Sequence, residues 1–273
     1  MHRFLLVFLV SFLSAAAADA GPGTGSPVLV ELFTSEGCSS CPPADALLRR
    51  LDAAQLQPGS QIIVLSEHVD YWDHDGWVDP YSSHIFTDRQ NAYSMRFGLA
   101  SPYTPEMVVD GQSEFVGSNA AKANAAIEKA RLQPKVAVNI SGVSLENGVL
   151  RAHVEVGTLP EGFGKHKADI YLALALDHAE SQVERGENQG RHLTHVGVVT
   201  SIHKIGTLEK ARTFAQDIST KVEHGKSGAG SLRVIVFLQE PAEGRILGAT
   251  QQSLSIVSTP RTAAVDRLKK RPI

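Results

Sequence analysis

Both cysteines of this chain lie three residues apart, at Cys38 and Cys41, and this pair constrains the fold more than any other feature. An apolar run at residues 28–33 ends shortly before the pair, and residues 44–56 repeat leucine at helical spacing after it. These patterns predict a buried strand, a short turn and a helix. Two prolines that follow the second cysteine suit the first helical turn, whose N–H groups have no partner within the helix. The sequence therefore places both thiols at the N-terminus of a helix.

Three interpretations of the cysteine pair are open. In a redox dithiol, the helix N-terminus would favour a thiolate at Cys38, and Cys41 would resolve a mixed disulfide formed there. In a structural bridge, so short a loop would remove little chain entropy, roughly 2 kcal/mol. In a metal site, both thiolates and a histidine would bind zinc or Cu(I). His68 is the first candidate, and His74, His192 and His195 are the others. The position of Cys38 favours the redox interpretation.

Length and composition limit the class of protein. The chain has 273 residues, of which 42% are hydrophobic and 20% charged, so it can bury a core. Its length favours roughly two domains at about 150 residues each. With 26 basic and 29 acidic side chains the net charge is −3, which argues against a nucleic-acid binder because no basic excess neutralises phosphates. No motif in the sequence indicates a cofactor, and none indicates an oligomeric state.

The first 20 residues predict export. A basic start at His2 and Arg3 precedes an apolar run at residues 4–13 and small residues that end at Ala20, which is typical of a cleaved secretory signal peptide. An uncleaved anchor is the alternative, but the run is shorter than the roughly 20 residues that span a bilayer. We therefore expect a periplasmic or secreted protein without membrane contact after cleavage, in a compartment where a dithiol can stay oxidised.

Residues 28–132 predict an α/β unit. Strands are expected at residues 28–33, 62–65, 107–110 and 113–116, and helices at residues 44–56, 87–97 and 120–132. The resulting order is β-α-β-α-β-β-α. Residues 67–81 are expected to form an ordered loop, which holds both tryptophans. There Tyr71, Trp72 and Trp77 either offer apolar contact area to a substrate or anchor the loop to the core.

Beyond Pro134 the pattern changes to strands and turns. Strands are expected at residues 136–140, 150–156, 170–176, 196–202, 232–238 and 246–254. A hairpin signal lies at Asn147 and Gly148, whereas residues 211–217 are ambiguous. Several strands separated by turn residues predict a mainly antiparallel, β-sandwich-like domain over residues 135–258. A basic tail follows at residues 259–273.

A strand, a Cys-x-x-Cys pair, a helix and a later Thr104-Pro105 that opens another strand together resemble the thioredoxin superfamily. The resemblance implies that Pro105 is cis, faces the dithiol and, with Thr104, shapes the surface that pairs with the backbone of a substrate. It also implies that Glu31, on the first strand, is a buried acid that relays protons to the resolving cysteine.

Four segments resemble, more closely, a secreted bacterial family known as domain of unknown function 1223: residues 30–45, 68–73, 103–111 and 190–195. This resemblance implies a thioredoxin-like fold followed by a C-terminal β region, and it implies no activity. We expect a thiol–disulfide oxidoreductase with Cys38 as nucleophile and Cys41 as resolving thiol, which acts on protein or small thiol substrates and has a redox partner. The alternative is a thioredoxin-fold module that binds a partner or a metal and has a non-catalytic cysteine pair.

Overall fold

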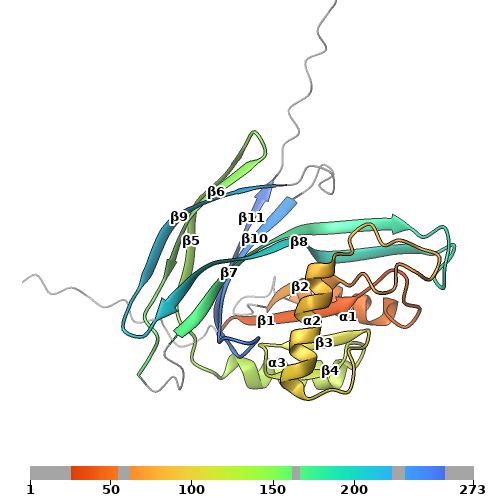
Figure 1. Ribbon diagram of the computed structural model, residues 1–273, viewed down its shortest axis with the longest axis horizontal. Helices are drawn as coiled ribbons and strands as arrows, with labels where there is room; N and C mark the ends of the chain where they lie inside the picture. The colour runs from red at the N-terminus through yellow and green to blue at the C-terminus, as the bar shows by residue number, and fades with distance from the viewer. Residues whose placement is uncertain (1–25, 55–61, 162–166, 223–230, 256–273) are drawn as a thin grey trace, which may run out of the picture.

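The computed structural model describes residues 26–54, 62–161, 167–222 and 231–255. Its architecture is mixed α/β, with one large mixed sheet and a second, antiparallel sheet (Figure 1). Within the described ranges, no helix is long and apolar enough to cross a membrane. The predicted leader, residues 1–20, and the basic tail, residues 259–273, lie outside the described residues.

In the part of the chain that the structure describes, the large sheet has eight strands in the order β11-β10-β7-β8-β2-β1-β3-β4. Their bounds are β1 (Val28–Thr34), β2 (Ile62–His68), β3 (Glu106–Val109), β4 (Ser113–Val116), β7 (Lys167–Gln182), β8 (His192–Glu209), β10 (Ser231–Gln239) and β11 (Ile246–Ser255). Strand β2 is parallel to β1 and β8, whereas the other neighbouring strands are antiparallel. Because Ser66 of β2 pairs with Val198 of β8, the two expected units at residues 28–132 and 135–258 share one sheet. The boundary between them stays a prediction.

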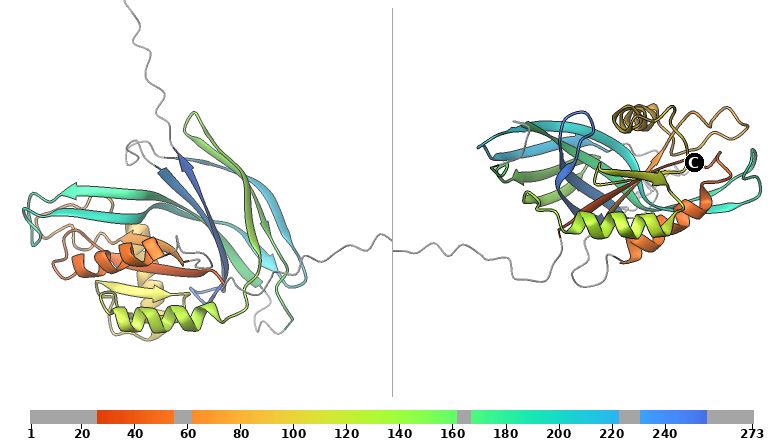
Figure 2. Two further views of the ribbon diagram at one scale, coloured as in Figure 1. Left: turned by 180° about the vertical axis from the view of Figure 1, so that it is seen from behind. Right: turned by 90° about the horizontal axis from the view of Figure 1, so that it is seen from below.

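Three helices cover the N-terminal part of this sheet. The helices α1 (Pro42–Ala54) and α3 (Ala120–Arg131) lie on one face, and α2 (His84–Phe97) lies on the other (Figures 1 and 2). Strand β1 is covered on both faces, so all seven of its residues are buried. Its alternation directs Val30 and Leu32 toward α1 and α3, and Leu29 and Phe33 toward α2.

The second sheet has the order β5-β6-β9. Its strands are β5 (Val138–Glu146), β6 (Val149–Val156) and β9 (Phe214–Lys221), and it packs against β7, β10 and β11 through an aliphatic core. Asn147 and Gly148 have positive φ at the β5–β6 turn, which agrees with the predicted hairpin. The ambiguous residues 211–217 contain a turn and then the start of β9, which pairs with β6.

Several strands are longer than their apolar patterns. The expected loop at residues 67–81 begins later, because Glu67 and His68 still belong to β2 and pair with Phe33 and Thr34. Both polar side chains are fully buried. Glu67 lies 3.7 Å from Arg89, and His68 contacts Asp79. These partners lie outside the local sequence pattern, and they allow the strand to continue through polar residues.

Candidate functional site

Cys38 and Cys41 form a disulfide at the start of α1. The N–H groups of Ala44 and Asp45 donate to the carbonyl oxygen of Cys41 at 2.8 and 3.1 Å, so the first helical turn follows directly after the pair. This position agrees with the sequence prediction. Both cysteines are fully buried, whereas Ser39 between them is exposed. Thiol exchange requires access to a sulfur atom, so the segments that cover the pair are central to its chemistry.

The loop before β3 lies against the cysteine turn. Ser40 Oγ is 3.3 Å from Cys38 Sγ and donates to the carbonyl oxygen of Thr104 at 3.5 Å. The Thr104–Pro105 peptide bond is cis, as the resemblance implies. The structure thus brings together four of the predicted site residues, Cys38, Cys41, Thr104 and Pro105.

The aromatic residues of the long loop between β2 and α2 are anchored by their polar atoms. Trp72 Nε1 donates to Thr104 Oγ1 at 2.7 Å, and Trp77 Nε1 donates to Glu36 Oε2 at 2.8 Å. Tyr71 donates to the side chain of Gln90, and burial raises the pKa of Tyr71 to about 12. These contacts agree with an anchoring role around the cysteine turn, and a role in substrate binding stays a prediction.

A loop from the C-terminal half of the chain also contacts the cysteine turn. This β7–β8 loop spans residues 183–191. Asn188 Nδ2 donates hydrogen bonds to the carbonyl oxygen of Glu36 at 2.8 Å and to that of Cys38 at 2.9 Å. The N–H group of Ser39 donates to Glu187 Oε2 at 3.0 Å. The cysteine turn is therefore held by both halves of the chain.

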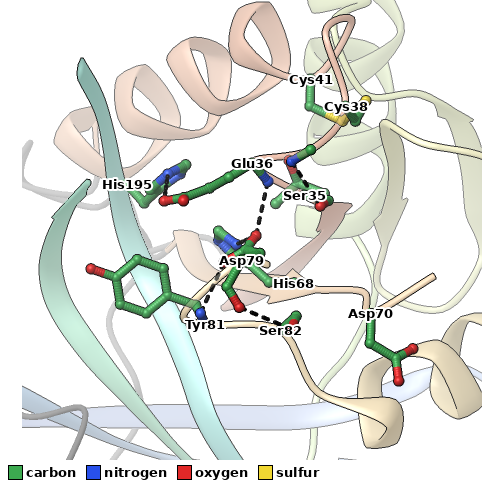
Figure 3. A network of polar contacts seen from close by, with 12 residues as sticks. Ser35, Glu36, Cys38, Cys41, His68, Asp70, Asp79, Tyr81, Ser82 and His195 are labelled. Atoms are coloured by element: carbon green, nitrogen blue, oxygen red, sulfur yellow. Dashed lines mark hydrogen bonds and ion pairs between the residues drawn. A yellow bond between two sulfur atoms is a disulfide. The ribbon is translucent and has the colours of Figure 1, made fainter. Parts of the chain in front are cut away.

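A buried polar network lies beside the cysteine turn (Figure 3). His68 Nδ1 is 2.7 Å from Asp79 Oδ2, and the same oxygen accepts the N–H of Glu36 at 2.8 Å. The carboxylate of Glu36 points away from the disulfide toward His195, whose Nε2 lies 3.3 Å from Glu36 Oε1. On the other side of this ring, His195 Nδ1 is 3.8 Å from Asp45 Oδ1. The network thus connects the cysteine turn, α1 and β8.

Charges in this network compensate one another. Burial opposes a charge on His195, but the carboxylates of Asp45 and Glu36 outweigh burial and raise its pKa to about 10. Burial likewise opposes ionisation of Asp79, and the charge and hydrogen bond of His68 lower its pKa overall. At neutral pH His195 is therefore a buried cation between two acids.

In the alternative interpretation of the cysteine pair, Cys38, Cys41 and His68 are the ligands of a metal ion. In the structure the two sulfur atoms are bonded to each other, and His68 contacts Asp79. Among the described residues, no group of three or more His, Cys, Asp or Glu side chains could hold a metal ion. A thiolate metal site would require the reduced pair.

Glu31 is buried, as the resemblance implies, but its partners lie on α2. It is fully buried on β1, where its carboxylate accepts hydrogen bonds from Arg89 Nε and the Tyr93 hydroxyl, both at 2.6 Å. Strand alternation explains this position, because Glu31 faces α2 whereas α1, which begins after Cys41, packs on the opposite face. Glu31 thus balances the charge of Arg89, and the expected proton relay to Cys41 stays a prediction.

Comparison with known proteins places the chain. A family model described as protein of unknown function (DUF1223) matches residues 29–239. The chain belongs to the DUF1223 family. No curated protein matches this DUF1223 chain.

Two solved structures resemble the DUF1223 chain along most of its length. Protein AGR_C_4864 from Agrobacterium tumefaciens is 24% identical with a TM-score of 0.62, and the match covers 83% of this chain and 94% of that protein. HBP35 of Porphyromonas gingivalis is 17% identical with a TM-score of 0.62, and the match covers 88% of this chain and 81% of that protein. At these identities the likeness concerns the fold alone.

Sequence reasoning missed several residues of the site in this DUF1223 protein. It did not single out Glu36 or Asp79, and it considered His195 only as a possible metal ligand. Asn188 lies in the polar segment 187–191, whose composition is typical of an ordinary turn. One signal was present for Glu36, an acid two residues before Cys38. The contact of Asn188 with Cys38 joins residues 150 positions apart and has no local signature.

Proposed function

We propose that this DUF1223 protein exchanges thiols and disulfides through Cys38 and Cys41. In this proposal residues 28–132 form a thioredoxin-like unit, and residues 135–258 form a second, β-sandwich-like unit. The observation that carries the proposal is the position of the disulfide, which lies at the N-terminus of α1 and against the Thr104–Pro105 loop. The strand order β2-β1-β3-β4, with helices on both faces, supports the same assignment.

The proposed reaction transfers two electrons. A substrate thiolate attacks Cys38 Sγ, the Cys38–Cys41 bond breaks, and Cys41 leaves as a thiolate that takes up a proton. The second thiol of the substrate, after losing its proton, attacks the sulfur that the substrate has bound to Cys38. A substrate disulfide forms, and Cys38 leaves as a thiolate that the helix N-terminus stabilises. The reverse sequence oxidises the pair and reduces a substrate disulfide. A redox partner then reoxidises or reduces the pair, which restores its starting state.

Protein thiols and small thiols are both proposed substrates. A cleft of about 370 Å³ lies between α1 and β8 and is large enough for a small molecule. Its lining on α1 begins at Pro42, the residue after Cys41. Pro42, Asp45 and Arg49 line it from α1, and Arg191 and His195 from the β8 side. We also propose that the protein works in the periplasm or outside the cell, where its disulfide can persist.

Trapping tests this function. In a bacterial host that expresses the full chain, Cys41→Ser should accumulate mixed disulfides through Cys38, because the resolving thiol is absent. They would appear on non-reducing gels as slower bands that a reductant removes. The matched control is the double variant Cys38→Ser, Cys41→Ser. Bands no more abundant in Cys41→Ser than in this control would contradict the proposal.

A further inference from the structure

A loop from the C-terminal half of the chain is attached to the turn that carries the buried disulfide. Both cysteines are fully buried although their turn lies at the surface, where Ser39 and Ser40 are exposed. The β7–β8 loop lies on this turn and is held there by side-chain hydrogen bonds. Asn188, itself fully buried, donates to the carbonyl oxygens of Glu36 and Cys38. Glu187 accepts the N–H of Ser39.

The shape of the β7–β8 loop is fixed independently of the cysteine turn. Its own backbone closes it, since Val183 and Arg191 are linked at 2.9 Å, and Gly190 donates to Val183 at 2.8 Å. Most of its residues are exposed, and within it only Val183 and Asn188 are buried. Gly186 also lies close to Asp75 and Trp77. A mostly exposed segment attached by a few such contacts opens at a lower free energy than the core does.

We propose that the β7–β8 loop is a clamp over the redox pair, with Asn188 as its positioning residue. A substrate sulfur reaches Cys38 only when the loop leaves the cysteine turn. The physiological meaning of the clamp rests on the proposed function. Its operation does not, because any reductant that attacks this disulfide must wait for the same opening.

The expected effect follows from the contacts. Asn188→Ala removes two hydrogen bonds from the closed state, each with a net worth of about 0.5–1.5 kcal/mol. If opening precedes attack, reduction should become about tenfold faster, which corresponds to about 1.4 kcal/mol. Glu187→Ala removes one exposed contact and should accelerate reduction by about two- to threefold.

Stopped-flow reduction by dithiothreitol tests the clamp in the full-length oxidised protein. The matched control is Gln189→Ala, an exposed neighbour on the same loop, which should react at the wild-type rate. Reoxidation should be accelerated by the same factor as reduction, so the midpoint potential of the clamp variants stays that of the wild type. A purely structural role for Asn188 would instead leave the two rates without a common factor and shift the midpoint potential.

Wild-type reduction rates in both Asn188→Ala and Glu187→Ala would overturn the clamp. If Asn188→Ala fails to fold, Glu187→Ala decides the question, because its side chain is exposed. The two proposals fail separately. Accelerated reduction without trapped partners would leave the clamp and remove the function, whereas trapped partners with unchanged rates would do the reverse.

Discussion

Glu106 carries a strong prediction for the pH dependence of stability. It follows Pro105 at the start of β3, is fully buried, and accepts a hydrogen bond from Gln90 at 2.8 Å through one oxygen. Burial, with smaller contributions from Glu114 and Glu31, raises its pKa from 4.5 to about 7. At about 1.4 kcal/mol per pKa unit, this rise corresponds to about 3 kcal/mol of stability.

The direction follows from the raised pKa. The folded protein keeps Glu106 protonated at a pH where the unfolded chain has lost that proton, so its contribution is complete below about pH 4.5 and is lost as pH rises through 7. Glu106→Gln keeps the shape and acceptor of the neutral acid and does not titrate. Relative to wild type, the variant should therefore gain about 3 kcal/mol between pH 4.5 and pH 8.

Urea unfolding at pH 4.5, 6, 7 and 8, followed by tryptophan fluorescence, measures this difference. Glu146→Gln is the control, because Glu146 is exposed on β5, and this variant should not reproduce the gain of Glu106→Gln. A difference between Glu106→Gln and wild type that stays constant from pH 4.5 to pH 8 would refute the reasoning.

Three further predictions test other parts of the structure. His195→Gln should abolish a fall in unfolding free energy that the wild type shows as pH rises from about 6.5 toward about 10, because the pKa of His195 is raised to about 10; parallel pH profiles in urea would contradict this. Arg89→Ala should lower the unfolding free energy by about 3–5 kcal/mol by leaving buried Glu31 without its cation. Adding Glu31→Gln should restore part of that loss, and strictly additive losses in urea would argue against the pair. Gly197→Ala should cost about 1–3 kcal/mol, since φ is +59° and a Cβ atom would lie 2.6 Å from the carbonyl oxygen of Val64 at the β2–β8 junction; an unchanged melting temperature would refute that strain.

Local chemistry explains which parts of the fold were predictable. The leucines at 47, 48 and 51 repeat at helical spacing and are buried on α1. Asn147 and Gly148 specify a turn that requires positive φ, and the hairpin is there. The cysteine pair was placed correctly at a helix N-terminus for the same reason, because strand, turn and helix follow one another in sequence.

Long-range pairing explains what was not predictable. The sequence pattern separates residues 28–132 from residues 135–258, yet β2 pairs with β8 in one sheet, and no local signal encodes that choice. The same applies to the clamp contact between Asn188 and Cys38, and to the pairing of Glu31 with Arg89. The burial of Glu31 was predicted correctly, but its partner Arg89 depends on the packing of α2.

The midpoint potential of the Cys38–Cys41 pair tests the central claim most directly. The purified oxidised protein is equilibrated with graded dithiothreitol or glutathione buffers, and the free thiols are trapped and counted by gel shift. A redox-active pair should titrate between about −270 and −120 mV. A midpoint below about −300 mV, which is typical of structural disulfides, would contradict the account.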